Sequence, residues 1–319
     1  MEETPVTIMR NTLLLLIVLL FCCLAPVSGQ EQALVPAEGG FPWWGWALLL
    51  FGFSFLLGII AVITGVGGGV LFVPIIGAIF PFHFDFVRGA GIMVALCGSL
   101  SAAPKLLGSG LGSIKLAFPL TLMVSLGSII GALIGLAVPE QLVKLLLGVT
   151  ILGIVFLMMI SKGSAVPDIR RPDPLTKLLD VAGSYYDKSE KKDIHWTIRR
   201  LPLGMILFLG IGFFAGMFGL GAGWANVPAM NMFLGAPLKV SVATSGFIIS
   251  MNSPAWVYLY RGAVLPLITV PSVAGMMLGT RLGAKLLPGA KPSFVRWAVT
   301  GILLLSGVKG ILEGAGIWV

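Results

Sequence analysis

Two glycine-rich runs carry the clearest capacity for chemistry in this sequence. They lie at residues 64–69 (TGVGGG) and 218–223 (FGLGAG), and each precedes a short apolar stretch that contains a proline. Glycine permits unusual backbone angles and lets a ligand approach the main chain closely. A helix that begins after such a run has unpaired N–H groups and a positive dipole end, which attract anions. The runs therefore predict anion-binding helix breaks, with close helix packing as the alternative role of the glycines.

Polar side chains near the glycine runs complete the candidate binding site. Few polar residues occur inside the apolar stretches, and one group, at 252–254, is expected to interrupt its helix. Side chains beside a proline kink can line a cavity, or they can satisfy the backbone carbonyls that the proline frees. Both interpretations stay open. The candidate substrate-binding residues are Thr64, Gly65, Gly67, Gly68, Gly69, Gly219, Gly221, Ala222, Gly223, Asn226, Thr244, Ser245 and Asn252.

Carboxylates are missing from the apolar stretches. The 13 Asp and Glu residues lie in the N-terminal region, in a polar stretch at 161–200, or at Asp85, Glu140 and Glu313. Buried carboxylates commonly bind the protons or cations that transporters move, so their absence argues against a cation substrate and leaves any coupling ion unknown. His83 and Asp85 are expected in a solvated loop. With two histidines and no Cys/His cluster, the sequence predicts neither a metal site nor a cofactor.

The composition indicates the class of protein that must position these residues. Charged residues make up 11% of the chain and hydrophobic residues 57%, with a mean hydropathy of +1.01. An average soluble chain has roughly 25% charged residues. These values exclude a soluble globular enzyme and a disordered chain. The net charge of +8 fits the basic cytoplasmic loops of a membrane protein, so no nucleic-acid partner is expected.

Apolar segments predict an all-α polytopic membrane protein with about eight full spans, since a span needs about 20 apolar residues. Two shorter segments, 68–80 and 222–234, follow the glycine runs and are expected to be half-helices or re-entrant elements. Residues 1–29 are expected to be a cleaved signal peptide or an uncleaved signal anchor. The predicted spans lie at roughly 43–64, 88–107, 115–137, 141–160, 202–219, 238–257, 263–284 and 293–312.

The segment 161–201 is expected to be a cytoplasmic charged loop, because its basic residues outnumber its acidic ones. Within it, Asp173 precedes Pro174. Aspartate is a favoured helix cap and proline suits the first helical position. A short amphipathic helix is therefore expected from Pro174, with leucines on one face.

The glycines and prolines of residues 43–160 recur, in order, in residues 202–312. This pattern predicts two transmembrane repeats. The first repeat starts outside and ends at the cytoplasmic loop, so it crosses the membrane an odd number of times and the second repeat is inverted. Inverted repeats with broken helices are typical of secondary transporters, whose substrates bind near the midplane. The recurring residues are Gly58/Gly212, Gly65/Gly219, Gly67/Gly221, Gly69/Gly223, Pro74/Pro228, Pro104/Pro254, Gly112/Gly262, Gly127/Gly275, Gly131/Gly279 and Gly135/Gly283, of which the last three pairs are expected to be helix-packing faces.

With the duplication and the glycine runs together, the chain resembles the sulfite exporter TauE/SafE family. In the first half the resemblance rests on Ile63–Gly69 and Val73–Pro74, and in the second on Gly212–Gly223, Val227–Pro228 and Ala243–Ser245. Two features depart from the family pattern, namely Ala222 in place of a third glycine and the length of the 161–200 insert.

The resemblance implies a secondary transporter of small sulfur-containing anions, such as sulfite, thiosulfate or organosulfonates, in the cytoplasmic membrane. The expected partners are the anionic substrate and the lipid bilayer, and the oligomeric state is not predicted. An anion channel, or a transporter of another small organic anion, is the alternative. An intramembrane enzyme is not expected, because no apolar segment holds a Ser–His pair or two carboxylates.

Overall fold

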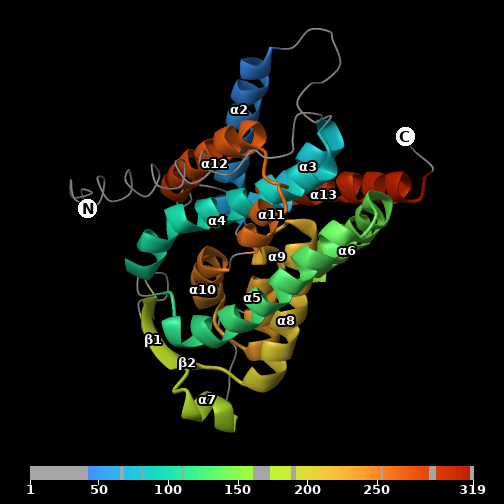
Figure 1. The fold of residues 1–319 in the computed structure, drawn as a ribbon. Coiled ribbons are helices and arrows are strands. Elements are labelled where there is room, and N and C mark those ends of the chain that lie inside the picture. The colour runs from blue at the N-terminus through green and yellow to red at the C-terminus, as the bar shows by residue number, and fades with distance from the viewer. Residues whose placement is uncertain are drawn as a thin grey trace.

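The computed structural model describes residues 42–64, 68–80, 82–108, 111–160, 173–187, 192–252, 254–286 and 292–316. Most of these residues are helical (Figure 1). The first half comprises α2 (Trp43–Thr64), α3 (Gly68–Ile79), α4 (Phe84–Gly108), α5 (Ile114–Ala137) and α6 (Glu140–Ile160). The second half comprises α8 (Leu201–Phe218), α9 (Gly223–Pro228), the π-helix η1 (Ala229–Leu234), α10 (Leu238–Met251), α11 (Ala255–Tyr260), α12 (Pro266–Leu286) and α13 (Pro292–Gly314).

The helices fall close to the predicted apolar segments. Four of the described helices contain a stretch long and apolar enough to cross a membrane by length and composition, in α2, α4, α5 and α8. The predicted half-helices correspond to α3 and to the continuous pair α9 and η1. A helical membrane protein is therefore supported, and the number of full spans stays a prediction. The N-terminal segment, expected to be a signal peptide or anchor, lies outside the described residues.

Large apolar side chains cover the outer faces of the long helices. Phe118 on α5, Ile206 on α8 and Phe156 on α6 are all exposed, and Ile206 has an exposed fraction of 69%. A water-soluble monomer rarely exposes apolar patches of this extent. These faces are suited to lipid, while the opposite faces of the same helices pack into the interior.

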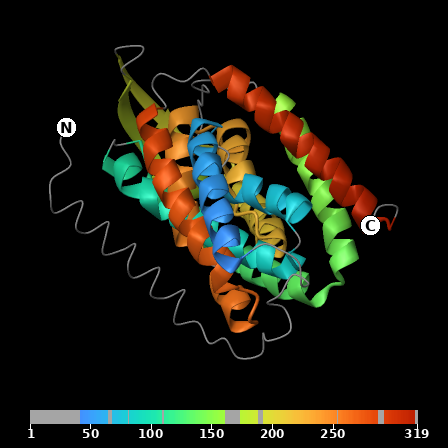
Figure 2. The same ribbon diagram turned by 90° about the horizontal axis from the view of Figure 1, so that it is seen from above.

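The two halves pack against each other through matched pairs of helices. α2 packs along α12, and α5 packs along α8. α4 packs against α10, and α6 lies beside α13 at one flank of the molecule (Figure 2). Under the predicted duplication, α2–α12 and α8–α5 are equivalent pairs, and α4–α10 and α6–α13 each join a helix to its counterpart. The pairs also have defined directions: α2 runs parallel to α12 and α5 parallel to α8, whereas α6 and α13 are antiparallel.

Glycines allow the long helix pairs to approach closely. A Cβ atom at Gly131 of α5 would overlap the carbonyl oxygen of Phe213 on α8, and one at Gly279 of α12 would overlap that of Phe55 on α2. Gly127, Gly135, Gly275 and Gly283 meet the partner backbone in the same way. The prediction that these regularly spaced glycines form packing faces is confirmed.

The charged segment contains a helix and a hairpin. Helix α7 (Pro174–Leu178) begins after Asp173, whose side chain accepts a hydrogen bond from the Thr176 amide, as the sequence predicts. Burial raises the pKa of Asp173, but hydrogen bonds from Thr176 and Leu201 outweigh it and hold the pKa below its usual value. The expected amphipathic helix is only five residues long.

An antiparallel hairpin follows α7 and was not expected from the sequence. Strand β1 (Ala182–Asp187) pairs with β2 (Lys192–Thr197). Tyr185 and Ile194 are buried against Val240 of α10, which joins the hairpin to the helical body. The polar segment is therefore anchored to the second half by apolar contacts.

Candidate functional site

The second glycine run forms a tight turn between α8 and α9. Gly219 and Gly221 both adopt left-handed backbone angles, with φ of +71° and +69°. An L-residue with a side chain rarely adopts such angles, whereas glycine does so without penalty. Gly219 also lies directly against the backbone of Arg88 on α4, and Ala222 is the N-cap of α9. The helix therefore ends here for two reasons. The glycines adopt backbone angles that other residues avoid, and the chain passes too close to α4 to leave room for a side chain at Gly219.

The first glycine run meets the second across α4. A Cβ atom at Gly69 of α3 would lie 2.5 Å from the Leu220 carbonyl oxygen and 2.9 Å from Cβ of Ala95. Ala95 also lies 2.8 Å from the Cβ position of Gly221. Residues from both halves are thus in contact at the breaks, and at Gly69 and Gly221 the missing side chain serves close packing.

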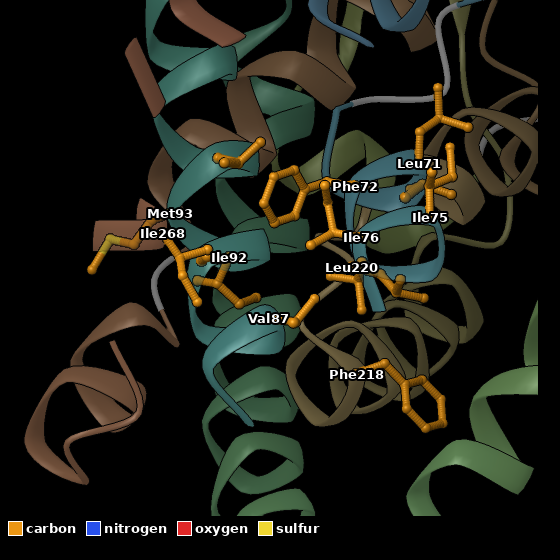
Figure 3. Packing of buried hydrophobic residues seen from close by; sticks show 14 of the residues in the cluster. Leu71, Phe72, Ile75, Ile76, Val87, Ile92, Met93, Phe218, Leu220 and Ile268 are labelled. Carbon is orange, nitrogen blue, oxygen red and sulfur yellow. The ribbon is translucent and has the colours of Figure 1, made fainter. Parts of the chain in front are cut away.

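Apolar side chains surround this meeting point. Figure 3 shows Leu220 of the second half beside Ile76 of α3 and close to Val87 of α4, with Phe72 near Ile76 and Phe218 farther off, its ring turned away from them. All five are buried and belong to one core cluster. The breaks are thus embedded in an apolar environment, where any polar group without a partner is costly.

Asn226 is such a polar group. It lies on α9 three residues beyond Gly223, and its side chain is fully buried. Neither its amide nitrogen nor its amide oxygen has a hydrogen-bond partner in the described part of the chain. An unsatisfied buried amide costs about 1–3 kcal/mol. The group is therefore available to a ligand at the second break.

Other candidate residues already have structural roles. Thr244 Oγ1 accepts a hydrogen bond from the Ser113 amide at 3.2 Å, next to the start of α5. Asn252 ends α10 and accepts a hydrogen bond from Ser128 Oγ on α5 at 2.7 Å. Ser245 is buried on α10. The predicted interruption is present between the end of α10 and the start of α11, and the Ser128 hydrogen bond ties Asn252 to α5.

The remaining candidates lie in or beside the first break. Thr64 is the last residue of α2, and Gly68 begins α3. A Cβ atom at Gly68 would lie 2.7 Å from the tip of the flexible Met276 side chain. Gly65 and Gly67 lie outside the described residues, so the two breaks can be compared only from Gly68 onward.

A pair of threonines shares a feature with Asn226. Thr121 on α5 and Thr269 on α12 occupy corresponding positions of the two halves, and both are buried. Neither hydroxyl has a hydrogen-bond partner among the described residues. The candidate residues predicted from the sequence include neither threonine. The signal available was their matched position in the predicted repeats.

Arg88 is a functional candidate that sequence reasoning missed. Its side chain is 1% exposed, and Nη1 donates to the carbonyls of Gly135 (3.0 Å) and Met217 (2.9 Å). Asp85 pairs with Nη2 of Arg88 from the first turn of α4. The expectation that Asp85 lies in a solvated loop is therefore wrong, because its contact with a buried arginine holds it on the helix. The sequence signal was an acid and a base three residues apart at the start of an apolar segment.

A second polar region lies between α3, α6 and α13. It forms a pocket open to the surface, whose lining includes Lys144, Ser306, Lys309 and Glu313. Lys144 pairs with Glu140 and Glu313, and Glu140 lies 3.3 Å from His83. Lys309 also pairs with Glu313, so both lysines that line this pocket have a carboxylate beside them. The described residues contain no cluster of His, Cys, Asp and Glu side chains suited to a metal ion.

Comparison with known proteins places these features in a family. The model of the sulfite exporter TauE/SafE family matches residues 48–310, which include both glycine breaks. The chain is 24% identical to the probable membrane transporter protein YunE of Bacillus subtilis (strain 168), over 84% of this chain and 98% of that protein. It is 27% identical to the probable membrane transporter protein ORF9 of Sinorhizobium sp, over 74% of this chain and 81% of that protein. No solved structure matches significantly. The chain belongs to the sulfite exporter TauE/SafE family of membrane transporters.

Proposed function

We propose that this protein is a secondary transporter that carries small sulfur-containing anions, such as sulfite, thiosulfate and organosulfonates, across the cytoplasmic membrane. The observation that carries the proposal is the buried amide of Asn226, which has no partner among the described residues. Its N–H groups can donate to the oxygens of an anion at the second glycine break. An oxyanion then supplies the acceptor oxygens that the apolar surroundings withhold from the amide nitrogen.

The charge distribution supports an anion as the substrate. From Ile194 to Leu312 the sequence contains no Asp or Glu, so the whole helical part of the second half up to the last turns of α13 lacks carboxylates. Intramembrane carboxylates are the common ligands of transported cations and protons. The family membership supports a transporter rather than an enzyme.

The helix directions support inverted repeats. α6 and α13 are the last helices of the two halves, and they pack antiparallel. Two copies related by an axis along the membrane normal would place such counterparts parallel, whereas an axis in the membrane plane places them antiparallel. The two glycine breaks also meet at Gly69 and Leu220, where residues of both halves contact each other. This is the arrangement of many secondary transporters, in which one half rocks against the other.

Uptake into proteoliposomes tests the proposed function. We expect concentrative uptake of labelled methanesulfonate, sulfite or thiosulfate, with chloride and sodium transported poorly. Uptake that only equilibrates the two compartments under every imposed ion gradient would favour the anion channel. Absence of oxyanion flux, or a preference for cations, would contradict the proposal.

Topology gives a separate prediction. We expect 161–200 to face the cytoplasm and the C-terminal end of α13 to face outside. In a background without Cys22 and Cys23, Ser184→Cys should resist a membrane-impermeant thiol reagent in intact cells, and Ala315→Cys should react. Both native positions are exposed in the structure. Ser184→Cys should react after permeabilisation, which serves as the control, and the reverse labelling pattern would exclude this orientation.

A further inference from the structure

Arg88 is a buried cation with unused hydrogen-bonding capacity. Its Nη1 atom is occupied by two backbone carbonyls at the C-terminal ends of α5 and α8, and its guanidinium carbon lies 5.3 Å from the ring centroid of Phe84. Its Nε atom is buried and has no partner in the described part of the chain. A charged residue this deeply placed in a membrane protein is costly and is generally retained for function.

The free Nε lies on the edge of the guanidinium that recognises oxyanions. Nε–H and one Nη2–H point the same way and can donate to two oxygens of a single anion. In the structure, Asp85 contacts only the Nη2 side of this edge through Oδ1. One donor of this edge, Nη2–H, is therefore occupied and the other, Nε–H, is not. Asp85 lies where one oxygen of a two-oxygen ligand would bind.

Asp85 can leave this position more readily than Arg88 can. Its side chain is 32% exposed, whereas that of Arg88 is 1% exposed. A carboxylate at the edge of the protein is rehydrated when it moves outward, but a buried guanidinium needs a replacement counter-ion. An incoming anion meets that need.

The location links Arg88 to the proposed transport path. The Arg88 backbone lies against Gly219, and its side chain shares the Met217 carbonyl with the hydroxyl of Tyr258, which also donates to the Gly216 carbonyl at 2.7 Å. Arg88 and Tyr258 thus hold the last turn of α8, from which the second glycine break begins. An anion bound to Arg88 would be adjacent to that break.

We propose that Arg88 binds the transported oxyanion through Nε–H and Nη2–H, with the anion replacing Asp85 as the counter-ion. This inference rests on the proposed function and adds a second position for the anion besides Asn226. Sulfite, sulfonates and carboxylates present one oxygen to each of the two N–H groups, whereas chloride offers a single acceptor atom to both.

Affinities for methanesulfonate and chloride, measured on purified protein, test this inference together with proteoliposome uptake. Asp85→Asn removes the competing carboxylate, so we expect methanesulfonate to bind at least threefold more tightly than to the wild type. Arg88→Lys keeps the positive charge but removes the paired Nε–H and Nη2–H donors. We expect this variant to bind methanesulfonate at least tenfold more weakly and chloride with little change. Unchanged or weaker methanesulfonate binding in Asp85→Asn would overturn the inference.

The double variant Arg88→Met/Asp85→Asn removes both charges, which avoids leaving either one unpaired in the interior. We expect it to fold and to show at least a tenfold higher KM for methanesulfonate uptake. If the wild type transports methanesulfonate and this variant has the same KM, the inference about Arg88 is overturned while the proposed function stands. Absence of oxyanion transport by the wild type would instead overturn the proposed function.

Discussion

Replacing Asn226 with leucine is expected to abolish oxyanion uptake while leaving the protein at least as stable as the wild type. The two side chains have the same branching and the same number of non-hydrogen atoms, and the Asn226 amide is buried without a partner among the described residues. Removing an unsatisfied buried polar group is expected to raise the free energy of unfolding by about 1–2 kcal/mol. Thermal unfolding in detergent and methanesulfonate uptake should be measured on the same preparation.

Asn231 provides the matched control, because it lies five residues later on the same helical segment and is already satisfied. Its Nδ2 donates to the Ala236 carbonyl at 2.9 Å. Asn231→Leu should lower stability by about 1–3 kcal/mol and leave the KM of the folded fraction close to wild type. If Asn226→Leu transports normally, or if it destabilises the protein as Asn231→Leu does, Asn226 is a structural residue and not a ligand.

The second large effect is expected at the interface of α5 and α8. A side chain at Gly212 would overlap the carbonyl oxygen of Val124, so Gly212→Val forces the two helices apart. Overpacking of this kind costs about 1–3 kcal/mol, and more where backbone is the obstacle. We expect a lower midpoint of thermal unfolding and a reduced yield of folded protein.

Gly210 lies on the same helix two residues earlier, and a Cβ atom there would meet nothing within 4 Å. Gly210→Val should therefore unfold within a few degrees of the wild type. Equal destabilisation by the two variants would show that helix propensity, and not interhelical contact, decides the outcome. The comparison thus isolates the close approach of α5 to α8.

The helical elements could be predicted because the sequence marks them strongly. The predicted segment 43–64 coincides with α2, and 115–137 differs from α5 by one residue. Long apolar runs define the helices, and glycine and proline mark where they stop. The half-helices were predictable for the same reason, since each is short and follows a glycine run.

The hairpin could not be predicted because its stability comes from outside its own segment. Tyr185 and Ile194 pack against Val240, a residue more than forty positions further along the chain. The surrounding residues are charged, so the alternating pattern of a strand is weak. Such a polar segment is predicted to be a loop unless its contact with α10 is already known.

Arg88 was missed for a comparable reason. Its carbonyl partners, Gly135 and Met217, lie 47 and 129 positions away in the sequence. The sequence places it at the start of an apolar segment, where a charged residue normally reaches solvent. Likewise, Gly69 and Leu220 lie far apart in the sequence but in contact in the structure. The glycine run therefore predicts a helix break, but it does not predict which residues pack against each glycine.

The central claim is that an oxyanion binds beside Asn226 at the second glycine break. The most direct test is a structure determined with selenite, which has the pyramidal shape of sulfite and contains an anomalously scattering atom. We expect a selenium peak next to Asn226, with one selenite oxygen about 3 Å from Asn226 Nδ2, and loss of that peak in Asn226→Leu. A protein that binds selenite only elsewhere, for example in the pocket between α3, α6 and α13, would contradict the account.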